Sequence, residues 1–215
     1  IVIDPREIEM TQFAILWLKQ KPGTDVAVFQ AIAQVILVEE LYDLEFISQR
    51  VEDFEKYAND IKECTPEWAE NISGVPADKI REAARIYAEA NHAAIYWGMG
   101  ISQSVHGTDN ALSLANLALI TGNLGKPGTG LNPLRGQNNV QGCSDAGGLP
   151  NVFPGYQSVS DPKIRGKFEK KWHTKLNPEV GLTTMEMVDA AEQGGIKGYM
   201  IMGENPMMSE PDLQH

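Results

Sequence analysis

The sequence is poor in cysteine and in positive charge, and both shortages limit what it can do. Its two cysteines, Cys64 and Cys143, lie far apart without a CxxC or Cys/His spacing. They therefore form no recognisable metal site and are most simply free thiols in a reducing compartment. Lysine and arginine number 18 against 29 acidic residues, which gives a net charge of −11, and no long basic run occurs. This balance argues against a nucleic-acid or anionic-membrane partner.

Long apolar runs are also missing. No run approaches the roughly 20 residues that a transmembrane helix needs, and no signal peptide is visible. We therefore expect no membrane contact and a cytoplasmic location, with a periplasmic one open if a signal lies outside this chain. The chain begins in a strand-like run, Ile1–Arg6, and stops soon after another, Gly198–Met202. We expect it to be a piece of a longer protein.

What is present is typical of a globular α/β protein, since 42% of the residues are hydrophobic and 22% are charged. Ile1–Ile3 is predicted to be the buried end of a strand, and Val26–Val38 is so apolar that it favours a helix packed on most sides. Thr24 is expected to cap that helix. Gly198–Met202 is predicted as a further buried strand. Other predicted helices are those within 41–92, beginning at Thr65-Pro66 and at Pro76, and those over Asp109–Ile120 and Met185–Gln193; 150–180 is expected to be irregular.

Polar or glycine-rich turns follow three of the apolar runs. Asp4-Pro5 ends the first, Gly98-Met-Gly100 ends the strand from Ala93, and Gly203-Glu-Asn-Pro206 ends the last. A ligand can approach the backbone closely at such turns. Asp-Pro alone is more often a simple turn, and the third glycine of the dinucleotide fingerprint is absent. One large ligand that spans two α/β units is the most economical explanation.

Another candidate segment is the loop Leu131–Leu149, which contains a single cation, Arg135, among glycines and carboxamides. A guanidinium can hold a carboxylate or phosphate through two parallel hydrogen bonds. The alternative is a solvated connector with an incidental arginine. His106 has two interpretations as well, a catalytic residue or, more often for a lone loop histidine, a surface or structural one.

Taken together, six segments resemble the catalytic subunit of molybdenum- or tungsten-dependent formate dehydrogenases, in the molybdopterin oxidoreductase family. The resemblance runs along the whole chain, and several ordered motifs are more specific than any one. The segments are Ile3-Asp-Pro-Arg6, Lys21-Pro-Gly-Thr-Asp25, Trp97-Gly-Met-Gly100, Leu119-Ile-Thr-Gly-Asn-Leu-Gly-Lys-Pro127, Leu134-Arg-Gly-Gln-Asn-Asn-Val-Gln-Gly142 and Met202-Gly-Glu-Asn-Pro206.

The resemblance implies an α/β fold of Rossmann-like parallel-sheet domains, the bis-molybdopterin oxidoreductase fold, which is incomplete in this fragment. It assigns residues 1–137 to one domain and 138–215 to part of a second, each binding one guanine dinucleotide. The cofactor is then bis(molybdopterin guanine dinucleotide) with molybdenum or tungsten. Matched by motif, the cofactor-binding residues are Ile3, Asp4, Pro5, Arg6, Gly23, Thr24, Asp25, Met99, Gly100, Gln103, Gly136, Gly203, Glu204 and Asn205.

The resemblance also implies that Arg135 orients formate, with Gln137 near it. Formate is a one-carbon carboxylate, so its charge is almost all that an enzyme can hold, and a bidentate guanidinium suits it. Arg135 would position the substrate and stabilise charge rather than act as an acid or base. The family's 4Fe-4S cysteines and its metal-binding cysteine or selenocysteine have no counterpart here, so no metal ligand is expected in this chain.

The expected function is therefore oxidation of formate to CO2 by the full-length parent, together with electron-transfer subunits. Two alternatives remain open. One is a nitrate or N-/S-oxide reductase of the same family, and the other is a non-catalytic α/β assembly module.

We predict that the isolated 215-residue chain does not oxidise formate, because the cluster cysteines and the metal ligand lie outside it. The measurement is a formate-dependent dye-reduction assay on the purified polypeptide, with the full-length parent as the positive control. Dye reduction by the isolated chain would show this prediction to be wrong.

Overall fold

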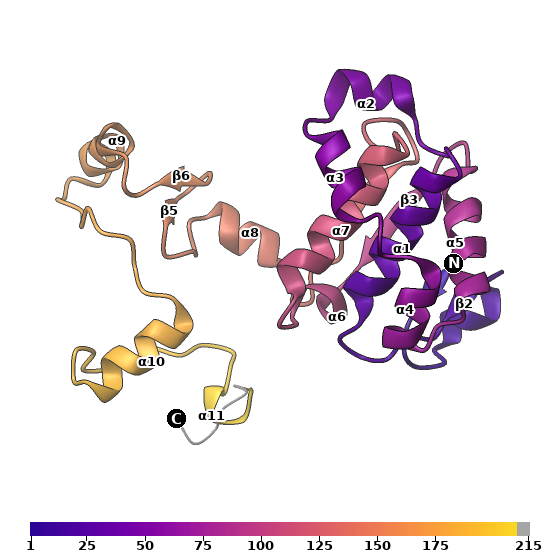
Figure 1. Cartoon of the computed structure of the whole chain (residues 1–215). Helices are drawn as coiled ribbons and strands as arrows, with labels where there is room; N and C mark the ends of the chain where they lie inside the picture. The colour runs from indigo at the N-terminus through magenta and orange to yellow at the C-terminus, as the bar shows by residue number, and fades with distance from the viewer. Residues whose placement is uncertain (210–215) are drawn as a thin grey trace. The chain divides into compact units, whose positions relative to one another are not determined.

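A computed structural model describes residues 1–209 and divides the chain into two compact units. The first comprises Ile1–Gly136 and the second begins at Gln137 (Figure 1). The expected boundary after residue 137 lies one residue from this division. The assignment of each unit to its own guanine dinucleotide stays a prediction.

Unit 1 contains two pairs of parallel strands. β1 (Val2–Ile3) pairs with β2 (Trp17–Leu18), with Val2 opposite Trp17. β3 (Ala94–Trp97) pairs with β4 (Gly130–Pro133), with Ala94 opposite Gly130. Parallel strands need long crossovers, and here these crossovers are helical. The predicted α/β class with parallel sheet is confirmed.

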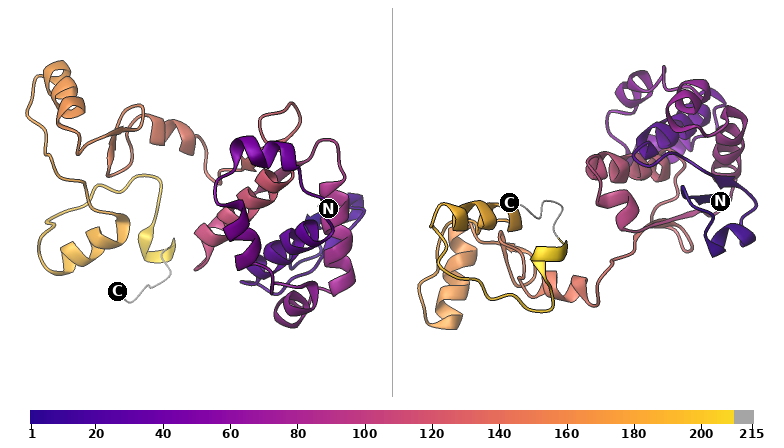
Figure 2. Two further views of the ribbon diagram at one scale, coloured as in Figure 1. Left: turned by 45° about the horizontal axis from the view of Figure 1, so that its top comes forward. Right: turned by 90° about the horizontal axis from the view of Figure 1, so that it is seen from below.

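Most elements of secondary structure in unit 1 are helices. Their bounds are η1 Glu9–Phe13, α1 Asp25–Val38, α2 Leu44–Arg50, α3 Phe54–Asp60, α4 Pro66–Ser73, α5 Ala77–Ala88, α6 Met99–Ser102 and α7 Gly107–Ile120. The strand pair at the N-terminus lies at the margin of the unit in both turned views (Figure 2).

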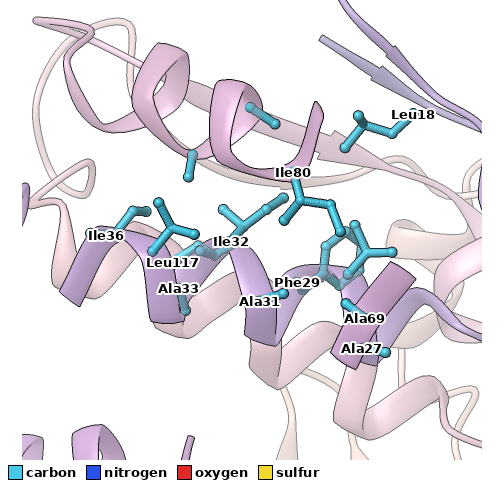
Figure 3. Close-up of a cluster of buried hydrophobic side chains, with 14 of the residues drawn as sticks. Leu18, Ala27, Phe29, Ala31, Ile32, Ala33, Ile36, Ala69, Ile80 and Leu117 are labelled. Atoms are coloured by element: carbon cyan, nitrogen blue, oxygen red, sulfur yellow. The ribbon is translucent and has the colours of Figure 1, made fainter. Parts of the chain in front are cut away.

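Helix α1 is the centre of the core of unit 1, as its sequence predicts. It packs against α4, α5 and α7. Alanines 27, 31 and 33 let neighbouring backbones approach, while Phe29, Ile32 and Ile36 fill the space between them (Figure 3). Fully burying one such large apolar side chain stabilises the fold by about 1.5–3 kcal/mol.

Of the two threonines in predicted helix starts, Thr65 caps its helix and Thr24 does not. Thr65 caps α4 by accepting a hydrogen bond from the Trp68 N–H at 3.2 Å, and Asp43 caps α2 through the Phe46 N–H at 2.9 Å. Thr24 occupies the N-cap position of α1, but its hydroxyl donates to the Lys21 carbonyl at 2.6 Å instead of accepting from the helix. The tight Lys-Pro-Gly turn brings that carbonyl within reach and competes for the hydroxyl.

Unit 2 has a smaller core of its own. Phe153, Val159 and Phe168 are buried together, and Trp172 contacts both phenylalanine rings, edge-on to Phe153 and tilted against Phe168. Its elements are α8 Val140–Asp145, the antiparallel pair β5 Val152–Phe153 and β6 Gln157–Ser158, α9 Pro162–Trp172, α10 Thr184–Glu192 and α11 Pro206–Ser209.

Three expectations for the second half are wrong. Gly198–Met202 forms no strand and is exposed, with Met200 92% accessible, because no other strand in the described part of unit 2 pairs with it. The region 150–180 contains α9, because Asp161 caps a helix that begins at Pro162: its carboxylate accepts a hydrogen bond from the Lys163 N–H at 2.7 Å. The Leu131–Leu149 segment is only partly a loop, because it includes most of β4 and all of α8. Among residues 1–209 no helix is long and apolar enough to cross a membrane.

Asn123 ties the end of α7 to the start of β3. Its side chain is 3% exposed; Oδ1 accepts from the Ala93 N–H at 2.9 Å and Nδ2 donates to Thr121 Oγ1 at 3.0 Å. A buried carboxamide with both ends bonded fixes where β3 begins.

We predict that Asn123→Ala lowers the free energy of unfolding by about 1–3 kcal/mol, because the Ala93 N–H loses its acceptor. Urea denaturation of the 215-residue chain measures this change. Asn91→Ala, at an exposed position nearby, is the matched control and should change stability by less than about 0.5 kcal/mol. Equal effects of the two variants would contradict the role given to Asn123.

Candidate functional site

The pairing of β3 with β4 brings two chemically distinct turns to one edge of unit 1. The Leu134 N–H donates to the Trp97 carbonyl at 2.7 Å, which extends the parallel ladder past the last strand residues. Gly98 then follows β3, and Arg135 follows Leu134. A Cβ built on Gly136 would lie 2.5 Å from Cε of Met99. The glycine turn and the arginine turn are therefore in contact.

The Asp4 turn is held by three hydrogen bonds. Its N–H donates to the Leu18 carbonyl at 3.2 Å, and its carbonyl accepts from Trp17 Nε1 at 2.9 Å. Its carboxylate accepts from the Arg6 N–H at 2.7 Å, which closes an Asx-type turn. The carboxylate thus stabilises the turn that Asp4, Pro5 and Arg6 form directly after β1.

Gln20 and Asp25 form a buried polar pair at the start of α1. Gln20 is 4% exposed, and its Nε2 donates to Asp25 Oδ1 at 2.9 Å. Gln20 Oε1 has no hydrogen-bond partner although it is buried. Buried acceptors are almost always satisfied in folded proteins. This atom is therefore available to accept a further hydrogen bond.

The Asp4 turn, the Gln20–Asp25 pair and the glycines at 98 and 100 border one cavity of about 600 Å³ in unit 1. Its walls are apolar, with Phe29 and Ile32 from α1, Ala83 from α5, and Leu114 and Leu117 from α7. Its remaining lining includes Ile1, Ile3, Asp4, Pro5, Arg6, Gln20, Gly23, Asp25, Tyr87, 94–98, Gly100 and Ile101. The cavity thus combines an apolar interior with polar turns at the strand ends.

Two details define the chemistry of this lining. Burial raises the pKa of the Tyr87 hydroxyl above its ordinary value. A Cβ built on Gly100 meets no atom within 4 Å, so the space above that turn is open. A planar, polar ligand could approach the backbone there without displacing a side chain.

The cavity brings together half of the predicted cofactor residues. Those that line it are Ile3, Asp4, Pro5, Arg6, Gly23, Asp25 and Gly100. The Thr24 hydroxyl donates to the Lys21 carbonyl within its own turn. Gln103 follows the last residue of α6, and its N–H donates to the Met99 carbonyl at 2.7 Å. Met99 and Gly136 contact each other beside Arg135.

The remaining predicted residues belong to unit 2. Gln137 begins that unit. Gly203 has a left-handed φ of 73°, and Glu204 accepts from the Ser209 hydroxyl at 3.3 Å, so a compact turn leads into α11. Asn205 directly precedes α11, and its carbonyl accepts from the Met208 N–H at 2.9 Å. His106 lies exposed at the start of α7, with Nδ1 3.6 Å from Asp109 Oδ2.

Sequence reasoning missed Gln20, Trp17 and Tyr87. Gln20 could have been suspected, because a polar residue between an apolar strand and a Pro-Gly turn occupies an inward position. Trp17 and Tyr87 gave no signal, since each resembles an ordinary core aromatic until its polar atom is located in space.

Known proteins match this chain along its full length. The sequence profile of a family described as molybdopterin oxidoreductase matches residues 1–215. F420-dependent formate dehydrogenase subunit alpha of Methanocaldococcus jannaschii is 52% identical over 216 residues, 100% of this chain and 32% of that protein. Formate dehydrogenase H of Escherichia coli is 46% identical over 214 residues, 99% of this chain and 30% of that protein.

A solved structure shows the same relationship in space. Acetylene hydratase from Pelobacter acetylenicus superimposes with a TM-score of 0.58 at 29% identity, over 59% of this chain and 18% of that one. This chain spans about a third of the length of the curated relatives it matches.

We predict that Asp25→Ala lowers the free energy of unfolding by about 1–3 kcal/mol, because Nε2 of buried Gln20 loses its acceptor. Asp25→Asn keeps an acceptor oxygen and removes only the charge at the start of α1, so its effect should be about 0.3–1 kcal/mol. Urea denaturation of the pair at pH 7 measures the difference. A larger loss for Asn than for Ala would contradict this assignment.

Proposed function

Because this chain belongs to the molybdopterin oxidoreductase family, we propose that it is part of the catalytic subunit of a formate dehydrogenase. The parent would oxidise formate to CO2 at molybdenum or tungsten held by two molybdopterin guanine dinucleotides. The observation that carries the proposal is the match of the whole chain to relatives named formate dehydrogenases, at 52% and 46% identity.

The cavity residues fit a nucleotide-bearing group. The orphaned Gln20 Oε1 needs a donor, and the space over Gly100 would accommodate a planar ring or a phosphate. Asp4, Arg6 and Gly23 border the same cavity. In unit 2, Gly203, Glu204 and Asn205 would hold the second dinucleotide. The metal centre, when bound, would supply the acceptor for the two electrons that formate loses.

Arg135 is proposed as the substrate clamp. It lies two residues after the end of β4, and the adjoining Gly136 touches Met99 of the glycine turn. Parallel strands deliver their carboxyl ends to one edge, which is where ligands bind in α/β folds. Two parallel N–H···O bonds would hold the formate carboxylate and leave its C–H bond directed away from the guanidinium. Gln137, two residues on, would support this geometry.

The parent would also need parts that this chain does not provide. A 4Fe-4S cluster and the protein ligand to the metal would come from other segments of the longer polypeptide. Electron-transfer subunits would then accept the electrons. A cytoplasmic location remains our expectation for the parent.

Two alternatives belong to different classes. A nitrate or N-/S-oxide reductase would share the fold, as acetylene hydratase does, but would reduce its substrate with electrons from a donor dye. A non-catalytic assembly module would bind neither metal nor pterin. Metal analysis and pterin fluorescence on the full-length parent distinguish that module from both enzymes.

We predict that Arg135→Lys in the full-length parent lowers formate turnover by at least about 100-fold, because an ammonium cannot form the two parallel bonds. Steady-state dye reduction measures turnover, while metal and pterin content should stay unchanged. Arg50→Lys, at an exposed position of α2, is the control and should retain full activity.

Other outcomes would change the assignment. Loss of metal and pterin in the Arg135→Lys variant would make Arg135 a cofactor ligand instead of a substrate clamp. Nitrate or N-oxide reduction by the parent, without formate oxidation, would favour the reductase alternative.

A further inference from the structure

Helix α9 of unit 2 concentrates positive charge in a chain that is acidic as a whole (Figure 1). It has five basic side chains and one carboxylate, a net charge of +4, whereas the whole chain carries −11. Four of the five are exposed lysines: Lys163, Lys167, Lys170 and Lys171. Each residue of an α-helix turns about 100° past the one before it, so these lysines lie within an arc of roughly 100°. We call this face the lysine stripe.

An adjoining face of α9 anchors the helix to the core of unit 2. Ile164, Phe168 and Trp172 follow one another at four-residue spacing. Phe168 is buried with Phe153 and Val159, and Ile164 packs against that cluster. The ring of Trp172 lies tilted against the ring of Phe168, with the centroids 5.0 Å apart. Because the apolar face is occupied by the protein's own core, the lysine stripe faces outward.

The nearest carboxylates do not neutralise the stripe. Asp161 caps the helix and accepts from two backbone N–H groups, the shorter bond being 2.7 Å. Glu169 accepts from the Leu176 N–H at 3.1 Å. Lys167 donates to a neutral group, Oε1 of Gln157, at 2.9 Å. The ion pairs found within residues 1–209 include none of the four lysines.

The fold of unit 2 alone does not explain the stripe. Lysines four residues apart on a helix repel each other, and Lys163, Lys167 and Lys171 have this spacing. The helix dipole favours Lys170 and Lys171 in the last turn. It disfavours Lys163, which is the second residue of the helix and lies at its positive end. An anionic surface placed against the stripe would relieve this repulsion.

The chemistry of the stripe favours an acidic protein over two other anionic partners. A helix that binds a membrane surface inserts its apolar face into the lipid, and the apolar face of α9 packs in the core instead. Surfaces that bind nucleic acid combine cations with stacking aromatic side chains or with arginines, and the stripe contains neither. The net charge of −11 also repels a polyanion that extends past this helix.

Lysine charges suit brief docking more than a permanent interface. The ammonium group is compact and strongly hydrated, and lysine is depleted in the buried centres of interfaces. Complementary charge mainly speeds association. From Lys163 to Lys171 the stripe is about 12 Å long, at 1.5 Å per residue. This length fits a small contact area, and redox partners form some of the smallest specific interfaces.

We propose that the lysine stripe is a docking surface for the acidic face of an electron-transfer protein, which it binds transiently through charge. The acidic chemistry of the partner rests on the stripe itself. Its electron-transfer role rests on the proposed function.

The first test measures binding of an acidic probe, a fluorescein-labelled peptide of ten glutamates, to the full-length parent by fluorescence anisotropy. At low ionic strength, the triple variant Lys163→Gln, Lys170→Gln and Lys171→Gln should bind the peptide at least about 10-fold more weakly than the unmodified parent. Added salt should weaken binding to the unmodified parent, because it screens exposed charges. Equal affinities of the triple variant and the unmodified parent would overturn the proposal.

A charge-matched control separates the stripe from net charge. The variant Lys19→Gln, Lys62→Gln and Lys197→Gln removes three exposed lysines elsewhere and should change the affinity less than about 2-fold. A control as weak as the stripe variant would show that only net charge matters and would overturn the proposal. Phosphatidylserine vesicles and a short DNA duplex are the comparison probes. Stripe-dependent binding of either that is tighter than that of the peptide would also overturn it.

The second test uses the parent together with its own electron-transfer subunit. With formate at low ionic strength, the triple stripe variant should reduce that subunit at least about 10-fold more slowly. Its dye reduction and thermal unfolding midpoint should stay unchanged, because no stripe residue belongs to the proposed cofactor or substrate site. Unchanged reduction of the subunit, or an equal loss of dye reduction, would overturn the proposal.

The two tests also separate this surface from the proposed function. A parent that binds the glutamate peptide through the stripe but does not oxidise formate would refute the proposed function and leave the acidic docking surface intact. A parent that oxidises formate but binds the peptide independently of the stripe would refute the docking surface alone.

Discussion

The candidate site depends on the parallel pairing of β3 with β4. The bond from the Leu134 N–H to the Trp97 carbonyl continues that pairing to the end of both strands. Because parallel strands end at the same edge, Gly98–Gly100 and Arg135 arrive together, although more than 30 residues separate them in the sequence. An antiparallel pair would have placed the two turns at opposite ends. The contact of Met99 with Gly136 follows from this pairing.

Pairing alone does not position the strands, and the helices complete the arrangement. Helix α1 is buried on nearly all sides, so it has little freedom to shift against α4, α5 and α7. Its first residue, Asp25, holds Gln20 through a buried hydrogen bond. Asn123, just after α7, holds the start of β3 through the Ala93 N–H. The polar anchors of the site therefore lie at the ends of the elements that form the core.

The sequence could predict whatever depends on local pattern. The apolar run of α1, the Thr65-Pro66 start of α4 and the glycine turn after β3 follow from residue spacing and capping chemistry. It could not predict features that depend on distant partners. Gly198–Met202 has the composition of a buried strand, but composition does not supply the neighbour that a strand needs. The orphaned oxygen of Gln20 and the Trp17 bond to Asp4 likewise arise only when separated segments meet.

The cavity of unit 1 combines two kinds of lining. Its volume of about 600 Å³ lies within the range of about 300–1,000 Å³ that ligand pockets span. The walls from α1 and α7 are apolar, whereas the turns at Asp4, Gly23 and Gly100 present backbone and polar groups that suit a nucleotide. Because these turns follow or precede elements that the core holds in place, a nucleotide that bound there would meet groups that are already positioned.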